Sequence, residues 1–150
     1  MPQRIFIGSD HAGFLYKEKI REKLTSDGYI VTDKGCFGEE SVDYPVFAGA
    51  VCTDVLKTEN SLGILICGSG IGMSITANKY KGIRCALCHN EYTAEMSRKH
   101  NNANVLALGA RVIGIDLAIE IVKKFISAQF EGGRHQKRLD LICEAEKSQL

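Results

Sequence analysis

The sequence carries almost no net charge and no long apolar run. Its 150 residues contain 19 Lys and Arg against 18 Asp and Glu, a formal net charge of +1. No global field therefore favours nucleic acid or an acidic membrane surface. The first residues, MPQRIFIGSD, hold no apolar segment of signal-peptide length, and no run is long enough to cross a bilayer. We therefore expect a cytoplasmic protein with a single domain spanning residues 1–150.

Internal repeats, low-complexity linkers and paired metal-ligand motifs are also missing. The six cysteines are more often free thiols than disulfides in a chain of this kind. Cys85 and Cys88 lack the second ligand pair of a zinc site, and haem attachment at Cys88-His89 would require export. The glycines at 68, 70 and 72 match neither the dinucleotide fingerprint nor a P-loop, since no Gly-Lys-Ser/Thr follows. We therefore expect neither a metal nor a cofactor.

Apolar strand-like runs and helical patterns alternate five times along the chain. The predicted strands are 4–9, 29–33, 62–67, 83–88 and 104–108, and the predicted helices are 14–26, 45–57, 73–80, 91–99, 115–130 and 134–147. This alternation predicts an α/β fold, a doubly wound, Rossmann- or flavodoxin-like five-stranded parallel sheet with helices on both faces. We expect the strand order 2-1-3-4-5. In that order the carboxyl ends of strands one and three lie side by side where the winding reverses.

The stretch LGILICGSGIGMS, residues 62–74, forms the centre of the predicted site. An apolar strand ends in Cys67, and glycine then occupies every second position. Such a loop lets backbone N–H groups converge on an anion or an oxyanion at the start of the next helix. A cysteine beside converging amides is favoured as the thiolate. A plain tight turn is the alternative. The loop residues are Gly68, Ser69, Gly70, Ile71 and Gly72.

Two further polar groups accompany this loop. Asp10 and His11 follow strand one, whose carboxyl end is expected beside Cys67. Asp10 is suited to a sugar hydroxyl and His11 to an anion; an Asp at a helix start with an incidental His is the alternative. His100 ends a predicted helix, where an exposed histidine favoured by the helix dipole is the alternative.

The second informative stretch is GRHQKR, residues 133–138. Arg134 and Arg138 share one helix face and place positive charge in a first turn, which the dipole disfavours. A bound phosphate would relieve this, and a solvated basic face is the alternative. Arg111, after strand five, is expected to join them. The combined inventory suits proton abstraction beside a carbonyl on a small phosphorylated substrate, with the glycine loop stabilising an enediolate.

The sequence resembles the type B ribose-5-phosphate isomerases, a family that also holds allose- and galactose-6-phosphate isomerases. The matching stretches are GSDHAGF (8–14), DYP (43–45), GILICGSGIGMSITANK (63–79), GIRCALC (82–88), SRKHNNANVLALGARVIG (97–114) and QFEGGRHQKRL (129–139). The resemblance implies interconversion of D-ribose 5-phosphate and D-ribulose 5-phosphate in the non-oxidative branch of the pentose phosphate pathway. An allose- or galactose-6-phosphate isomerase is one alternative, and a non-catalytic, flavodoxin-like module that binds a phosphosugar is a more remote one.

The resemblance also implies roles for single residues. Cys67 would be the base that moves a proton between C1 and C2, and the loop 68–72, with the Ser69 hydroxyl, would hold the enediolate. His100 would donate a proton in opening of the furanose ring. Family members are dimers or tetramers with the site at the subunit interface, where His100, Asn101 and Arg111 come from the partner and the helix at about 134–147 packs. The substrate-binding residues would be Asp10 and Asn101 at the sugar oxygens, Tyr44 near the substrate, and His11, Arg111, Arg134 and Arg138 at the phosphate.

Overall fold

One parallel sheet organises the computed structural model, which describes residues 3–148. Its strands are β1 (Arg4–Ser9), β2 (Ile30–Asp33), β3 (Ser61–Cys67), β4 (Cys85–Leu87) and β5 (Val105–Gly109). The helices are α1 (Phe14–Ser26), α2 (Tyr44–Lys57), α3 (Ile71–Ala77), α4 (Glu91–Lys99), α5 (Ile115–Ser127) and α6 (Arg134–Lys147). The predicted α/β class and the alternation of strands and helices are confirmed.

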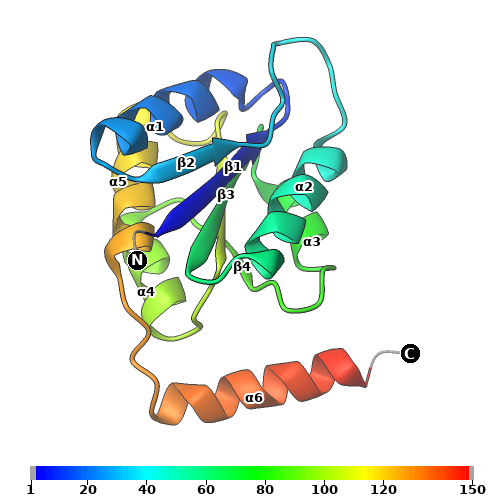
Figure 1. Ribbon diagram of the computed structural model, residues 1–150, viewed down its shortest axis with the longest axis vertical. Coiled ribbons are helices and arrows are strands. Elements are labelled where there is room, and N and C mark those ends of the chain that lie inside the picture. The colour runs from blue at the N-terminus through cyan, green and yellow to red at the C-terminus, as the bar shows by residue number, and fades with distance from the viewer. Residues whose placement is uncertain (1–2, 149–150) are drawn as a thin grey trace.

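Helices cover both faces of the sheet. Figure 1 shows α1, α4 and α5 on one side of the sheet and α2 and α3 on the other. Successive residues of β3 alternate between the two layers, because side chains of a strand point to opposite faces. Ile64 and Ile66 pack with the α1, α4 and α5 layer, whereas Leu65 and Cys67 pack with the α2 and α3 layer. Cys67 therefore enters the site from the face that α3 covers.

The order of the last two strands differs from the prediction. The sheet runs β2-β1-β3-β5-β4, so the expected 2-1-3-4-5 is wrong at its final pair. All five residues of β5 are buried, whereas the three residues of β4 are half-buried or exposed, as an edge strand allows. A fully apolar strand gains more free energy in the centre of a sheet than at its edge. The predicted meeting of β1 and β3 is confirmed, with Ser9 paired to Ile66.

Several element boundaries shift by a few residues. α3 begins at Ile71 rather than at 73, directly after Gly70, whose φ of 78° reverses the chain. β4 covers only three residues of the predicted 83–88. The N-cap of α4 forms as its sequence indicates, since the Asn90 side chain accepts the N–H of Thr93 over 2.8 Å.

α6 extends away from the sheet and its covering helices (Figure 1). Its bounds match the predicted helix. His135 and Leu139 are its buried residues, whereas Leu141 and Ile142 are about half exposed. Near its end, Oε1 of Glu146 accepts the Gly82 N–H over 3.0 Å. Within residues 3–148, we find no helix that combines the length and the apolar character needed to span a membrane.

Candidate active site

Cys67 ends β3 with its side chain almost fully buried, at 4% exposure. The backbone N–H of Gly70 donates to its Sγ over 3.2 Å, so the sulfur is a hydrogen-bond acceptor here. This contact requires the left-handed turn at Gly70, where a Cβ would lie 2.8 Å from the carbonyl carbon of Leu108. Only glycine fits there, so glycine at position 70 is required for this N–H to face the Cys67 sulfur.

The other thiols have different surroundings. Burial raises the pKa of Cys52 to about 11 and that of Cys85 to about 12, so both stay protonated near neutral pH. The Cys36 thiol donates to the carbonyl oxygen of Gly38 over 3.3 Å. Among the cysteines of residues 3–148, Cys67 is the one whose sulfur accepts a backbone N–H, an arrangement that suits a base or nucleophile.

The loop after Cys67 presents free backbone donors. The Ser69 hydroxyl accepts the N–H of Ile71 over 3.2 Å and so caps the start of α3. In the described part of the chain, the N–H groups of Gly68, Ser69 and Gly72 have no acceptor. Donors of this kind, fixed beside a reactive sulfur, can stabilise negative charge that develops on a substrate oxygen.

A pocket of about 580 Å³ opens over this loop, a size suited to a small ligand. Arg111 reaches it because β5 lies directly beside β3: the Arg111 N–H donates to the Gly68 carbonyl over 2.9 Å. A Cβ on Gly68 would lie 3.2 Å from Nη1 of Arg111, so the guanidinium lies over this glycine. Arg111 thus joins the site of its own chain, which departs from the expectation that it comes from a partner. The lining residues are Asp10, Tyr44, Cys67, Gly68, Ser69, Ile71, Gly72, Ile75, Arg111 and Val112.

Asp10 and Tyr44 form a further part of the pocket wall. Asp10, only 7% exposed, follows β1, and its Oδ1 accepts the N–H of Gly13 over 3.1 Å. Tyr44 begins α2 and lies against the loop, since a Cβ on Gly72 would lie 2.5 Å from two carbon atoms of its ring. Glycine at 72 therefore makes room for Tyr44. Aspartate, aromatic ring, thiol and guanidinium together provide hydrogen-bond acceptors, an apolar wall, a sulfur that can act as a base, and a positive charge.

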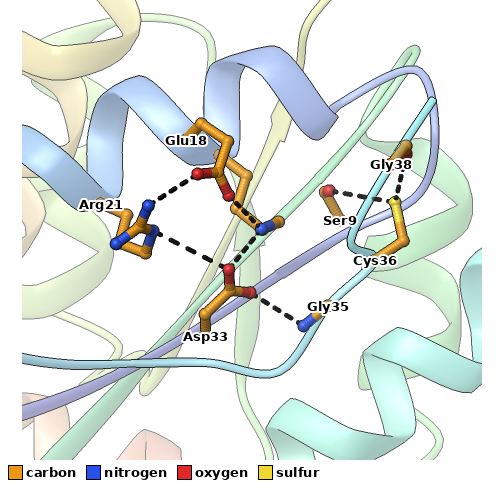
Figure 2. A network of polar contacts seen from close by, with 8 residues as sticks. Ser9, Glu18, Arg21, Asp33, Gly35, Cys36 and Gly38 are labelled. Carbon is orange, nitrogen blue, oxygen red and sulfur yellow. Dashed lines mark hydrogen bonds and ion pairs between the residues drawn. The ribbon is translucent and has the colours of Figure 1, made fainter.

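His11 lies beside this wall without lining the pocket. Its Nδ1 accepts the N–H of Val42, at the far end of the loop that follows β2. The near end of that loop is anchored by a polar network that sequence reasoning missed (Figure 2). Lys17, fully buried, contacts Asp33 at 2.6 Å and Glu18 at 2.8 Å, and Asp33 also accepts the Gly35 N–H. Lys17 shares the apolar stripe of Ile20 and Leu24 on α1, which was the available signal.

The remaining predicted residues lie outside the pocket. His100 caps the end of α4 and stacks on His135 of α6, with 4.3 Å between ring centroids. Asn101, Arg134 and Arg138 are exposed, and Asn101 lines a separate hollow near Ile142 of α6. A single chain therefore does not bring these four residues to Cys67. His135 and its neighbour Glu131 were not predicted as a pair with His100.

A group that could hold a metal occurs in the described residues at His100, Glu131 and His135, whose ligand atoms lie within 4.8 Å of one another. The two imidazole planes are only 15° apart and stacked. Nitrogen lone pairs lie in the ring planes, so two nearly parallel rings do not direct them at one point. In this arrangement the group is not preorganised for a metal.

Known proteins match nearly the whole chain. A family model described as Ribose/Galactose Isomerase matches residues 5–142. Ribose-5-phosphate isomerase B of Escherichia coli (strain K12) is 47% identical over 145 residues, which cover 97% of this chain and 97% of that protein. The structure of ribose-5-phosphate isomerase B from Clostridium thermocellum superposes with a TM-score of 0.95 at 52% identity, covering 97% of this chain and 98% of that one.

A third relative was solved with a sugar phosphate in place. It is ribose-5-phosphate isomerase B of Mycoplasma genitalium with bound ribulose-5-phosphate, with a TM-score of 0.93, 44% identity and 99% of each chain covered. Similarity of this extent, together with the pocket around Cys67, sets aside the reading as a non-catalytic binding module. The chain belongs to the ribose/galactose isomerase family and is an isomerase of the type B ribose-5-phosphate isomerase group.

Proposed function

We propose that the chain interconverts D-ribose 5-phosphate and D-ribulose 5-phosphate through an enediolate, with Cys67 as the base. The observation that carries the proposal is the buried Cys67 sulfur, which accepts the Gly70 N–H inside a pocket shared with Asp10 and Arg111. The Cys67 thiolate removes the proton from C2 of the open-chain aldose, and the resulting thiol returns a proton to C1. A second proton moves between O1 and O2, so the reaction is balanced without an oxidant.

The loop and the charged residues have separate tasks in this mechanism. The free N–H groups of Gly68, Ser69 and Gly72 support the proposal because they can stabilise the enediolate oxygen, a charge absent from the ground state. Asp10 accepts sugar hydroxyls. Arg111 binds the phosphate together with His11, Arg134 and Arg138, which fixes the reacting carbons against the sulfur. His100 opens the furanose ring, and Asn101 binds a sugar oxygen.

We infer that the complete site needs a second copy of the chain. Within one chain, His100, Asn101, Arg134 and Arg138 lie away from Cys67. The rim of the pocket carries apolar side chains that are about half exposed, namely Ile71, Ile75 and Val112. Exposed apolar surface around a polar centre is typical of a surface that another protein covers. A homodimer, with α6 at its interface, would cover the rim and bring the missing residues.

The same site also suits other sugar phosphates as substrates. The family model includes galactose as well as ribose isomerases, so an allose- or galactose-6-phosphate isomerase is the alternative substrate assignment. A comparison of kcat/KM on ribose, allose and galactose phosphates decides between them. The six free cysteines support a reducing compartment, and we place the reaction in the cytoplasm, in the pentose phosphate pathway.

The test is conversion of ribose 5-phosphate to ribulose 5-phosphate with EDTA present. We expect the wild-type chain to be active, and C67A to lose about 10²- to 10⁴-fold in kcat while its fold is retained. C52A, which removes a buried thiol of α2 that does not line the pocket, is the matched control and should keep full activity. An inactive wild type would overturn the substrate assignment, and a fully active C67A would overturn the assignment of the base.

A further inference from the structure

Three side chains from separate segments meet beside α4, and the mechanism above uses only one of them. His100 is the C-cap of α4, Glu131 lies in the segment before α6, and His135 belongs to the first turn of α6. The Glu131 N–H donates to the carbonyl oxygen of Lys99 over 3.0 Å, which ties this segment to the end of α4. The backbone thus holds the three residues together independently of their side chains.

Their side chains share one carboxylate oxygen. Nε2 of His100 and Nε2 of His135 each lie 3.6 Å from Oε1 of Glu131. The two rings stack with centroids 4.3 Å apart and planes 15° from parallel. The side chain of His135 is 6% exposed, whereas that of His100 is 38% exposed. His100 is therefore the accessible member of the pair, supported from behind by a buried ring.

We propose that Glu131 and His135 are positioning residues that fix the orientation of His100 and stabilise the positive charge it carries while it transfers a proton in ring opening. This inference rests on the proposed isomerase reaction and on His100 as its ring-opening group. It assigns to the carboxylate the part that an acidic residue plays beside a catalytic histidine in other enzymes.

The geometry specifies which nitrogen of His100 faces the sugar. Glu131 lies at Nε2, so Nδ1 is the atom free to give a proton to the ring oxygen or take one from the O1 hydroxyl. A carboxylate at the opposite nitrogen stabilises the imidazolium that exists between these two transfers. The 3.6 Å separation is slightly longer than a hydrogen bond, and such contacts shorten when substrate is bound.

His135 supplies a rigid, uncharged surface for the other ring. Burial, and then the charges of His100 and Arg134, lower the pKa of His135, with Glu131 opposing them. His135 therefore stays neutral near pH 7. The carboxylate of Glu131 is then available to stabilise the positive charge on His100. The charged and titratable groups that act on His135 are His100, Arg134, Glu131 and Arg138, and Glu95 and Glu131 act on Lys99, which precedes His100.

The test separates ring opening from proton transfer at carbon. Ribose 5-phosphate is supplied as the furanose, whereas ribulose 5-phosphate cannot close a furanose because its O5 carries the phosphate. For E131Q we expect kcat on ribose 5-phosphate to fall at least about tenfold. Total proton removal from C1 of ribulose 5-phosphate, measured by NMR in D₂O as aldose formed plus C1-deuterated ketose, should change by no more than about threefold, since Cys67 performs it.

Matched variants complete the experiment. E95Q removes the carboxylate of a partly exposed Glu95–Lys99 ion pair on α4 and should leave both rates unchanged. E131D keeps the charge but is one methylene shorter, so its kcat on ribose 5-phosphate should lie between those of wild type and E131Q. H135N should reproduce the E131Q pattern more weakly.

Two results would overturn the inference. One is a wild-type kcat for E131Q on ribose 5-phosphate, and the other is an equal loss of both rates in E131Q and E131D. A wild-type chain inactive on both sugars would instead overturn the proposed function, which makes the two failures distinguishable.

Discussion

The backbone N–H of Val42 donates to Nδ1 of His11 over 3.1 Å, joining two segments that lie 31 residues apart. Since Nδ1 accepts, the ring carries its proton on Nε2, so His11 presents a hydrogen-bond donor to an anion.

Substitution of His11 should separate its two nitrogens. In H11Q the side-chain amide reaches the Nε2 position, whereas in H11N it reaches only the Nδ1 position. In the proposed mechanism His11 binds the phosphate through Nε2. We expect KM for ribose 5-phosphate to rise about tenfold or more in H11N and less in H11Q, because only H11N loses the donor at the Nε2 position. Steady-state kinetics and inhibition by inorganic phosphate measure this. A larger KM for H11Q than for H11N would contradict the assigned tautomer.

Removal of the buried ammonium of Lys17 should destabilise the fold. K17M removes the buried cation between Asp33 and Glu18 and leaves Arg21 beside both carboxylates. Breaking a buried ion pair costs about 3–5 kcal/mol, and we expect a loss toward the lower end of that range because Arg21 remains. K19M, on the exposed side of the same helix, should cost no more than about 0.5 kcal/mol. Urea unfolding followed by circular dichroism measures both variants. Equal stabilities would show that the network in Figure 2 contributes nothing to folding.

In three glycine-to-alanine variants, the loss of unfolding free energy should depend on what the new Cβ atom contacts. G70A combines a φ of 78° with contacts to the Leu108 backbone, which cannot move, so we expect a loss of about 2–4 kcal/mol. G28A has a similar φ of 95° but open space, so only about 1 kcal/mol is expected.

G72A meets only the ring of the half-exposed Tyr44, which can rotate away. It should raise KM and leave the free energy of unfolding nearly unchanged. Denaturant unfolding and kinetics on the same preparations distinguish the three variants, and a G28A as damaging as G70A would exclude the steric explanation.

The stability of the chain should fall in acid through Glu18. Hydrogen bonds from Arg21 and then from Lys17 lower the pKa of Glu18 to about 2, against 4.5 for the ordinary side chain. Since the folded-state pKa is depressed, this stabilisation is complete above pH 4.5 and is lost as the pH falls toward 2. The shift corresponds to about 3 kcal/mol, which solvent screening reduces to about 1–2 kcal/mol.

Urea unfolding of wild type and E18Q at pH 7 and pH 3 tests this. E18Q should be the less stable at pH 7, and the difference should shrink at pH 3. A difference independent of pH would assign the contribution to packing rather than to the charge.

Most of the element order could be predicted from the sequence, because short apolar strands and amphipathic helices alternate clearly. The relation of β4 to β5 could not. Both are apolar runs of similar length. Which of them lies at the edge of the sheet depends on which strand the helices cover on both faces. The position of Arg111 depended on that choice, since β5 brings it to Gly68 only as the neighbour of β3.

The parts of the candidate site that are formed by residues adjacent in sequence could be predicted. Cys67 with its glycines and Asp10 with His11 are each contiguous in sequence and follow adjacent strands. Lys17 and Glu131 were missed because their roles depend on segments distant in the chain. A lysine on an apolar stripe and a glutamate before Gly132 become informative only once Asp33 and His100 are known to lie beside them.

The pairing of Cys67 with Gly109 affects the barrier of the proposed reaction. A Cβ on Gly109 would lie 2.6 Å from the carbonyl oxygen of Ser69, so the glycine loop rests directly on the backbone of β5. A loop seated this closely cannot move further toward β5. In the proposed mechanism its donors already surround the sulfur before the sugar arrives, so their arrangement adds no reorganisation cost to the barrier for proton transfer.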